Sequence, residues 1–341
     1  MFIINNNKLN KGVINMNNFK KIGLTALAAS LVSVSANAGE LSISGAASMN
    51  VGGYSGENHN RGATFSMGNQ FTVTGGGELD NGMTVSISYQ LDHANGVTGP
   101  FDDHSVTVSS DTMGTLVLAG HGGSSAVTAF DATAAGNVWD TFDGARGTAS
   151  DASTAVVTAL GMSDTAPGNN SLMYTLPSLM DDLTVNLSYQ PQAKGIDSGT
   201  GFAVHYTGVE GLSLSYGIAD EVGTSSALSG EQTAYKISYA YGPVTVTYTD
   251  SEFDVQTAAS DQDVSSMAVS YTISDEMSVT YGTEEFSTTA ATDREYTVLK
   301  GSYTSGGMTV SAQMKEAENV AHGTASNQDF EYWGLGLAFA F

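Results

Sequence analysis

The chain of 341 residues has no cysteine, only 5 prolines and only 11 lysine and arginine residues. The absence of cysteine excludes disulfide bonds, thiolate zinc sites and cysteine nucleophiles. The 35 acidic residues give a formal charge of −24, and a surface of this sign repels nucleic acid and attracts cations. Long apolar runs are also lacking, because no stretch after residue 38 reaches the length that a transmembrane helix needs.

Glycine and aromatic residues are abundant. The chain contains 40 Gly, 15 Tyr and 13 Phe, together with many Ser and Thr. This aromatic content is too high for a disordered chain, and the composition favours a folded protein built mostly of β-structure.

The N-terminal residues have the layout of a secretory signal. Residues 16–21 are basic and polar, residues 22–32 form a largely apolar run of 11, and Ala36 and Ala38 stand at the spacing of a cleavage site. We therefore expect a signal peptide cleaved after Ala38. A membrane anchor is the alternative, but 11 residues are too few to span a bilayer. Residues 1–15 are interpreted as an upstream extension.

Without residues 1–38, the chain that we expect to fold is residues 39–341. Four of the 11 basic residues lie in the leader and none of the 35 acidic residues does, so the remaining chain carries seven basic groups against 35 acidic ones. An exported chain without helical spans is released, periplasmic or built into the outer membrane as a barrel.

One short alternating pattern recurs along the chain. It reads MTVSISYQ from Met83, LTVNLSYQ from Leu183 and VTVTYTD from Val244, so that apolar residues alternate with Ser, Thr or Asn. This period is typical of a strand with one apolar and one polar face. Tight-turn signals such as DNG and SGG precede the copies. The eight copies begin at residues 41, 83, 115, 183, 212, 244, 277 and 308.

Most intervals between the copies are about 30 residues, enough for a strand, a loop, a returning strand and a turn. Eight such hairpins predict an all-β protein, a sixteen-stranded antiparallel transmembrane barrel with short turns at one end and longer loops at the other. In lipid the sheet must close, because no water satisfies an open edge. Sixteen strands enclose a lumen too wide for side chains to fill, so water occupies it. A soluble sandwich or β-helix is the alternative.

One interval breaks the period. From Thr115 to Leu183 there are 68 residues, and the surplus lies in residues 122–168, rich in Ala, Gly, Ser and Thr. A loop this long is normally functional. We expect it to fold inward and constrict the pore, the alternative being an external surface loop. Its charged residues are Asp131, Asp140, Asp143, Arg146, Asp151 and Asp164.

Together these features resemble the general diffusion porins of Gram-negative bacteria, especially the sixteen-stranded trimeric type of alphaproteobacteria. The resemblance covers residues 39–341 and rests on the signal peptide, the strand number, the long loop after the fifth strand and the final Phe341. It implies a homotrimer in the outer membrane, in contact with the lipid bilayer and lipopolysaccharide. It also implies that residues 122–168 form the constriction.

The last strand, YWGLGLAFAF, alternates large apolar residues with Gly and Ala. We expect it to pair with the first strand, with its large side chains toward lipid and its small ones toward the lumen. The resemblance implies that the barrel assembly machinery reads this strand as a signal, with Trp333, Phe339 and Phe341 as its residues.

The resembled family pairs acids on the loop with a basic cluster on the facing wall. Here the early region has only Arg61, which we expect in the first loop, and Arg146 is expected to pair with Asp143 or Asp151. A Lys or Arg facing lipid costs about 2–4 kcal/mol at the midplane, so the basic strand residues should face the lumen. The predicted pore-wall residues are Lys236, Arg294, Lys300, Lys315 and His205.

Catalytic motifs are absent from the sequence. Only residues 102–105, DDHS, suggest hydrolysis, and neighbouring strand residues should point to opposite faces. Acidic pairs such as Asp140 with Asp143, or Asp261 with Asp263, could bind Ca²⁺ weakly or be solvated surface charge. We therefore expect no enzyme and no cofactor beyond weakly bound Ca²⁺, but a passive pore that prefers cations. An adhesin or structural barrel, or an outer-membrane hydrolase, is the alternative.

Overall fold

The computed structural model describes residues 41–56, 59–60, 63–92, 101–127, 130, 132–142, 169–191, 198–221, 230–255, 261–288, 291–320 and 328–341. The predicted extension, signal peptide and cleavage site lie outside these residues. No helix in the described part of the chain is both long and apolar enough to cross a membrane.

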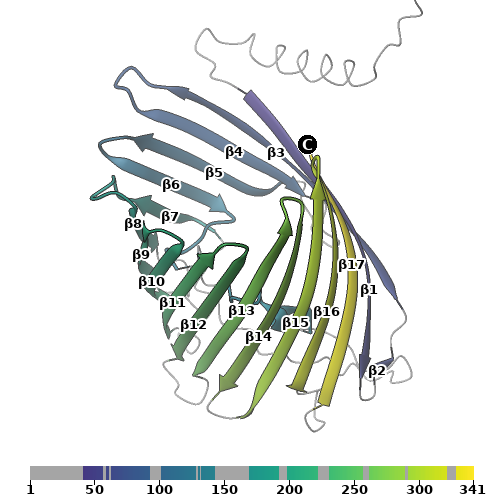
Figure 1. The fold of residues 1–341 in the computed structure, drawn as a ribbon. Coiled ribbons are helices and arrows are strands. Elements are labelled where there is room, and N and C mark those ends of the chain that lie inside the picture. The colour runs from purple at the N-terminus through teal and green to yellow at the C-terminus, as the bar shows by residue number, and fades with distance from the viewer. Residues whose placement is uncertain are drawn as a thin grey trace, which may run out of the picture.

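Almost all described residues belong to one antiparallel sheet that curls into a barrel (Figure 1). The strands are β1 (Leu41–Gly56), β2 (His59–Asn60), β3 (Thr64–Glu78), β4 (Thr84–Asp92), β5 (Phe101–Ser110), β6 (Gly114–His121), β7 (Ser171–Thr175), β8 (Leu183–Gln190), β9 (Gly199–Val209), β10 (Leu212–Glu221), β11 (Gly230–Tyr241), β12 (Val244–Val255), β13 (Gln262–Ser274), β14 (Met277–Thr288), β15 (Ala291–Ser305), β16 (Met308–Val320) and β17 (Gln328–Ala340). One 3₁₀ turn, η1 (Val138–Thr141), lies between β6 and β7.

The ring closes between its first and last strands. Each strand from β3 to β17 pairs with the next, β1 pairs with β3, and β17 pairs with β1 from Ala46↔Ala340 to Gly56↔Phe330. The two-residue β2 pairs only with β1, which leaves sixteen strands in the ring. The predicted all-β barrel is confirmed, and closure leaves no unpaired edge.

The turns at one end of the barrel are short, as the turn signals predicted. At the turn between β9 and β10, Gly211 has φ of +75°, and a Cβ there would lie 2.4 Å from the carbonyl oxygen of Ala240. Only glycine fits this close approach without strain. Most connections at the other end are longer, apart from residues 289–290 between β14 and β15, and the connection after β6, the fifth strand of the ring, is the longest.

The alternation along each strand separates an outward apolar face from an inward face. In β17, Trp333 and Leu335 are 41% and 55% exposed on the outward face, whereas Tyr332 packs on the inward side. The free end is held as well, because the backbones of Gly45 and Phe341 exchange two hydrogen bonds of 2.8 and 2.9 Å. The last strand is therefore paired along its whole length.

Candidate functional site

The chain that leaves β6 turns into the barrel. We call the described residues 122–127, 130 and 132–142 the inner segment. Ala126 donates its N–H to Ser188 Oγ of β8 at 2.9 Å, and Lys236 of β11 donates to the carbonyl of Ala132 at 3.4 Å. Figure 1 shows η1, which belongs to this segment, within the ring of strands. The described part of the predicted loop therefore lies inside the lumen.

Hydroxyl groups of the wall bind the backbone of the inner segment. Ala134 donates its N–H to Thr249 Oγ1 of β12 at 2.8 Å, and Ala135 donates to Ser266 Oγ of β13 at 3.0 Å. Gly282 of β14 makes room for this contact, because a Cβ there would lie 2.7 Å from the Cβ of Ala135. The polar face of the strands thus satisfies backbone donors that would otherwise need water.

Glu284 of β14 is the strongest anchor of the inner segment. Its carboxylate accepts the N–H of Val138 at 2.9 Å, the N–H of Trp139 at 3.1 Å and the hydroxyl of Thr133. Its side chain is almost fully buried, so these three donors replace the hydration of the carboxylate. Two of these donors are the first N–H groups of η1, where a negative charge is favourable.

The sequence reasoning did not single out Glu284. A signal existed, because this Glu stands at an inward position of an alternating strand, between Gly282 and Phe286. A single carboxylate on the inward face of a strand needs hydrogen-bond donors in the lumen. Only the folded chain shows which groups donate to it.

The end of the inner segment packs into an aromatic cluster. Phe142 is fully buried, and its ring lies 6.0 Å from that of Tyr296 on β15 and 6.3 Å from that of Tyr54 on β1. The hydroxyl of Tyr54 also donates to the carbonyl of Thr141 at 2.7 Å. Between Ser188 and Tyr54 the inner segment therefore follows the wall from β8 to β1.

The predicted pore-wall residues lie on the inward face, but in different settings. Lys315 donates to the hydroxyl of Thr141, and Lys300 is exposed opposite Gln313. Arg294 is 4% exposed, and its guanidinium lies 5.5 Å from the ring centre of Phe286, so it contacts the packed wall rather than open lumen. Its Nη1 atom has no hydrogen-bond partner in the described part of the chain.

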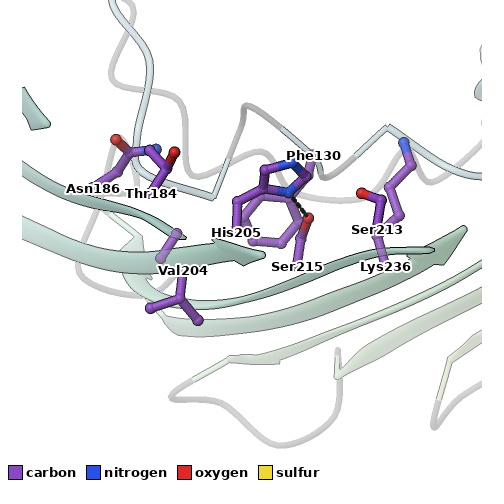
Figure 2. A pocket seen from close by; sticks show the side chains of 9 residues that line it. Phe130, Thr184, Asn186, Val204, His205, Ser213, Ser215 and Lys236 are labelled. Carbon is purple, nitrogen blue, oxygen red and sulfur yellow. Dashed lines mark hydrogen bonds between the residues drawn. The ribbon is translucent and has the colours of Figure 1, made fainter. Parts of the chain in front are cut away.

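His205 and Lys236 line one cavity of about 310 Å³ between the inner segment and the wall. Figure 2 shows His205, Ser215 and Lys236 on the same side of the strands, whereas Val204 points to the other side. Nδ1 of His205 lies 2.7 Å from Ser215 Oγ, and Phe130 of the inner segment borders the cavity.

Among the predicted constriction acids, Asp140 is described and is exposed on η1. It is close enough to Lys315 to interact electrostatically. Asp131, Asp143, Arg146, Asp151 and Asp164 lie outside the described residues, and so does half of the predicted Ca²⁺ pair of Asp140 and Asp143. Those parts of the site stay predictions.

Much of the acidity lies on the outside of the barrel. On β11 to β17, Glu284 is the single acidic strand residue that the structure describes on the inward face. We call the outward carboxylates near the long connections the acidic girdle. Its residues are Asp220, Glu231, Asp250, Glu252, Asp254, Asp263, Glu285, Asp293, Glu295, Glu316, Glu318, Asp329 and Glu331.

Several girdle residues face one another directly across neighbouring strands. The register pairs Glu252 with Asp263, Glu285 with Glu295 and Glu316 with Glu331. Directly opposed like charges are destabilising in a sheet. The net charge of the chain is therefore a poor measure of the charge that lines the lumen.

The sequence cluster at residues 102–105 does not assemble as the sequence suggested. His104 stacks with Tyr89, with ring centres 6.5 Å apart, whereas Asp103 pairs with His121 of β6. The expectation that Asp102 and Asp103 point to opposite faces is wrong, because both carboxylates lie within 4.0 Å of His121. A break in the register between β4 and β5 accounts for this.

Comparison with known proteins agrees with this architecture. A family model described as Gram-negative porin matches residues 23–341. An anion-selective porin from Comamonas acidovorans has a TM-score of 0.64 at 15% identity, covering 89% of this chain and 99% of that chain. A triple mutant of the Rhodopseudomonas blastica porin has a TM-score of 0.60 at 15% identity, covering 88% and 100%. No curated protein matches.

Proposed function

Because the chain belongs to the Gram-negative porin family, a family of outer-membrane channels, we propose that it passes small hydrophilic solutes and ions by passive diffusion. The observation that carries this proposal is the inner segment, which lies inside a closed barrel and is bonded along its inner wall from Ser188 to Tyr54. A solute that crosses the barrel must pass this segment.

Selection in such a pore follows from its width and from the groups that line it. The inner segment narrows the lumen, and its anchors at Glu284 and in the aromatic cluster keep the opening at a constant size. No bond in the solute is made or broken, so the proposed function requires no catalytic residue.

Single-channel recording tests the constriction. Shortening the inner segment within residues 132–142 should increase conductance, because the lumen behind it becomes accessible. The control shortens residues 222–229, the connection between β10 and β11, and should leave the conductance nearly unchanged. Equal conductance of the first variant and the unmodified pore would contradict the proposal, and would favour an adhesin or structural barrel.

We further propose that the pore prefers cations at low ionic strength. The acidic girdle near the long connections raises the cation concentration at the mouth. Lys236, Lys300 and Lys315 oppose this inside the lumen. Salt screens the attraction of the distant girdle for a passing ion more than the repulsion from the lysines in the lumen, which lie closer to the ion. The preference for cations should therefore weaken as salt rises.

A reversal-potential measurement across a salt gradient decides the selectivity. A cation-selective potential in dilute salt that declines in concentrated salt supports the proposal. Anion selectivity in dilute salt overturns it, and would match the property by which the Comamonas porin is described.

The assembly partners are proposals of the same kind. By family resemblance the barrel forms a homotrimer, contacts lipid and lipopolysaccharide, and is inserted by the barrel assembly machinery. Light scattering of the detergent-extracted protein tests the trimer. A mass of three mature chains supports it, and a monodisperse single mature chain, lighter than the 35.2 kDa of the uncleaved sequence, contradicts it.

A further inference from the structure

Two aspartates and a histidine meet where β5 and β6 adjoin the long connections. His121 Nδ1 lies 2.9 Å from Asp103 Oδ1 and 4.0 Å from Asp102 Oδ1. One ligand atom from each of the three residues lies within 4.8 Å of the other two. No other group of three or more His, Asp or Glu in the described residues meets this spacing.

Two breaks in the strand register bring these side chains together. Between β4 and β5, Tyr89 pairs with His104 but Leu91 pairs with Phe101, so β5 holds one extra residue at Asp102 and Asp103. A bulge of this kind lets two successive side chains leave the regular alternation. Two adjacent aspartates therefore reach the same partner, which a regular strand would prevent.

The second register break places the imidazole of His121 beside the two aspartates. Between β5 and β6, His104 pairs with His121 but Ser105 pairs with Ala119, which leaves Gly120 as the extra residue. The next residue, Gly122, has φ of +66°, and a Cβ there would lie 2.1 Å from Asp103 Oδ1. Only glycine leaves the space that the Asp103 carboxylate occupies.

The charge at this place is unbalanced. In the part of the chain that the structure describes, no Lys or Arg forms an ion pair with Asp102 or Asp103, and His121 is their one ion-pair partner. The three side chains are 36–47% exposed, so a dissolved ion can reach them. Two carboxylates and one imidazole leave a negative charge that a divalent cation would neutralise.

We propose that Asp102, Asp103 and His121 bind a divalent transition-metal ion, with Zn²⁺ as the best match. Tetrahedral zinc with ligands at about 2.1 Å sets neighbouring ligand atoms about 3.4 Å apart. The distances of 2.9 and 4.0 Å from His121 Nδ1 lie on either side of this value, so small rotations of the exposed Asp102 and Asp103 side chains bring both into range. Imidazole nitrogen favours zinc over Ca²⁺ and Mg²⁺, which take oxygen ligands. Three protein ligands leave the fourth zinc position to water.

Binding must displace a proton. Nδ1 of His121 lies at hydrogen-bond distance from Asp103 Oδ1, and zinc must replace any proton between these two atoms. That proton leaves to solvent, and the zinc-bound neutral imidazole carries its one proton on Nε2. The site is at the root of the inner segment, since His121 ends β6. It is separate from the proposed constriction, and zinc binding can succeed or fail without any effect on the function proposed for the pore.

Calorimetric titration of the folded, metal-stripped protein with zinc chloride tests the proposal. We expect saturable binding, and His121→Gln and Asp103→Asn should each weaken zinc affinity by about tenfold or more. The matched control, His205→Gln, removes a histidine bonded to Ser215 and should leave the affinity unchanged. Calcium chloride should show no binding that depends on His121.

Unchanged zinc affinity in both site variants would overturn the proposal. Should a variant fail to fold, carbethoxylation of the unmodified protein decides the same question by peptide mass analysis. Zinc should protect His121 several-fold more than His104, whose ring stacks on Tyr89 instead. Equal labelling of His121 with and without zinc would contradict the site.

Discussion

At the scale of single residues, the position of the inner segment depends most on Glu284. A buried carboxylate is costly unless donors surround it, and here a hydroxyl and two backbone N–H groups do so. The anchor and the loop therefore depend on each other. Loss of the carboxylate leaves the loop donors unpaired, and loss of the loop leaves a bare charge in the wall.

We predict that Glu284→Gln loosens the inner segment. Val138 and Trp139 each donate to a different oxygen of Glu284. Gln replaces one of these oxygens with an amide nitrogen, which is a donor, so the two N–H groups no longer each face an acceptor. A hydrogen bond to a charged group contributes about 1.5–3 kcal/mol, and this contribution should be largely lost. Single-channel recordings should show larger and noisier conductance.

The adjacent residue provides the control for this prediction. Glu285→Gln removes the same charge from an exposed outward position one residue further along β14. It should leave the noise of the open channel unchanged. Equal effects of the two variants would mean that the charge, and not the anchoring of the inner segment, sets the conductance.

At the scale of elements, β17 shows where the large apolar side chains of the last strand lie in the barrel. Its large side chains lie outward and its glycines lie inward, where Gly336 faces Ser311 and Asn50 at distances that admit no side chain. The ring of Phe341 lies over Gly45, and the backbones of these two residues close the barrel with two hydrogen bonds. The strand is therefore a closure element.

We predict that Phe341→Ala lowers the amount of inserted barrel more than it changes the pore. The ring is 80% exposed and follows the outward face of β17, so its loss removes apolar surface without changing the side chains that line the lumen. Quantifying protein in purified outer membranes, together with single-channel recording, measures both effects. Leu179→Ala, at an exposed turn residue, is the control. Normal insertion would contradict a role in assembly.

At the scale of the whole molecule, the acidic girdle accounts for where much of the negative charge is placed. The described carboxylates of β10 to β17 lie mainly on the outward face near the long connections, and neighbouring strands set several of them directly opposite each other. Each opposed pair destabilises the sheet by a few tenths of a kcal/mol to about 1 kcal/mol.

We predict that the barrel is more stable at high ionic strength. The range of the repulsion falls from about 30 Å at 0.01 M salt to about 3 Å at 1 M salt, so opposed carboxylates repel less. The melting temperature of the detergent-solubilised barrel should rise with salt. The double variant Glu285→Gln with Glu295→Gln should show a smaller rise, and an equal rise would contradict the role of this pair.

The sequence by itself determined the architecture. Strand starts, turn signals, the sixteen-strand ring and the position of the one long loop follow from local alternation and from the need to close a sheet in lipid. The orientation of the lysines followed too, because a charge facing lipid is costly. These features depend on neighbours in the chain or on the solvent.

Only the tertiary structure decided which residues meet. The contacts of Glu284 with η1, of Phe142 with Tyr296, and of Asp103 with His121 join distant segments or depend on breaks in strand register. The alternation rule predicted opposite faces for Asp102 and Asp103, and this was wrong. A bulge at these two residues interrupts the regular alternation of side chains. The net charge of the sequence also did not show where the acidic side chains lie. Only the paired strands place each carboxylate on the inward or the outward face.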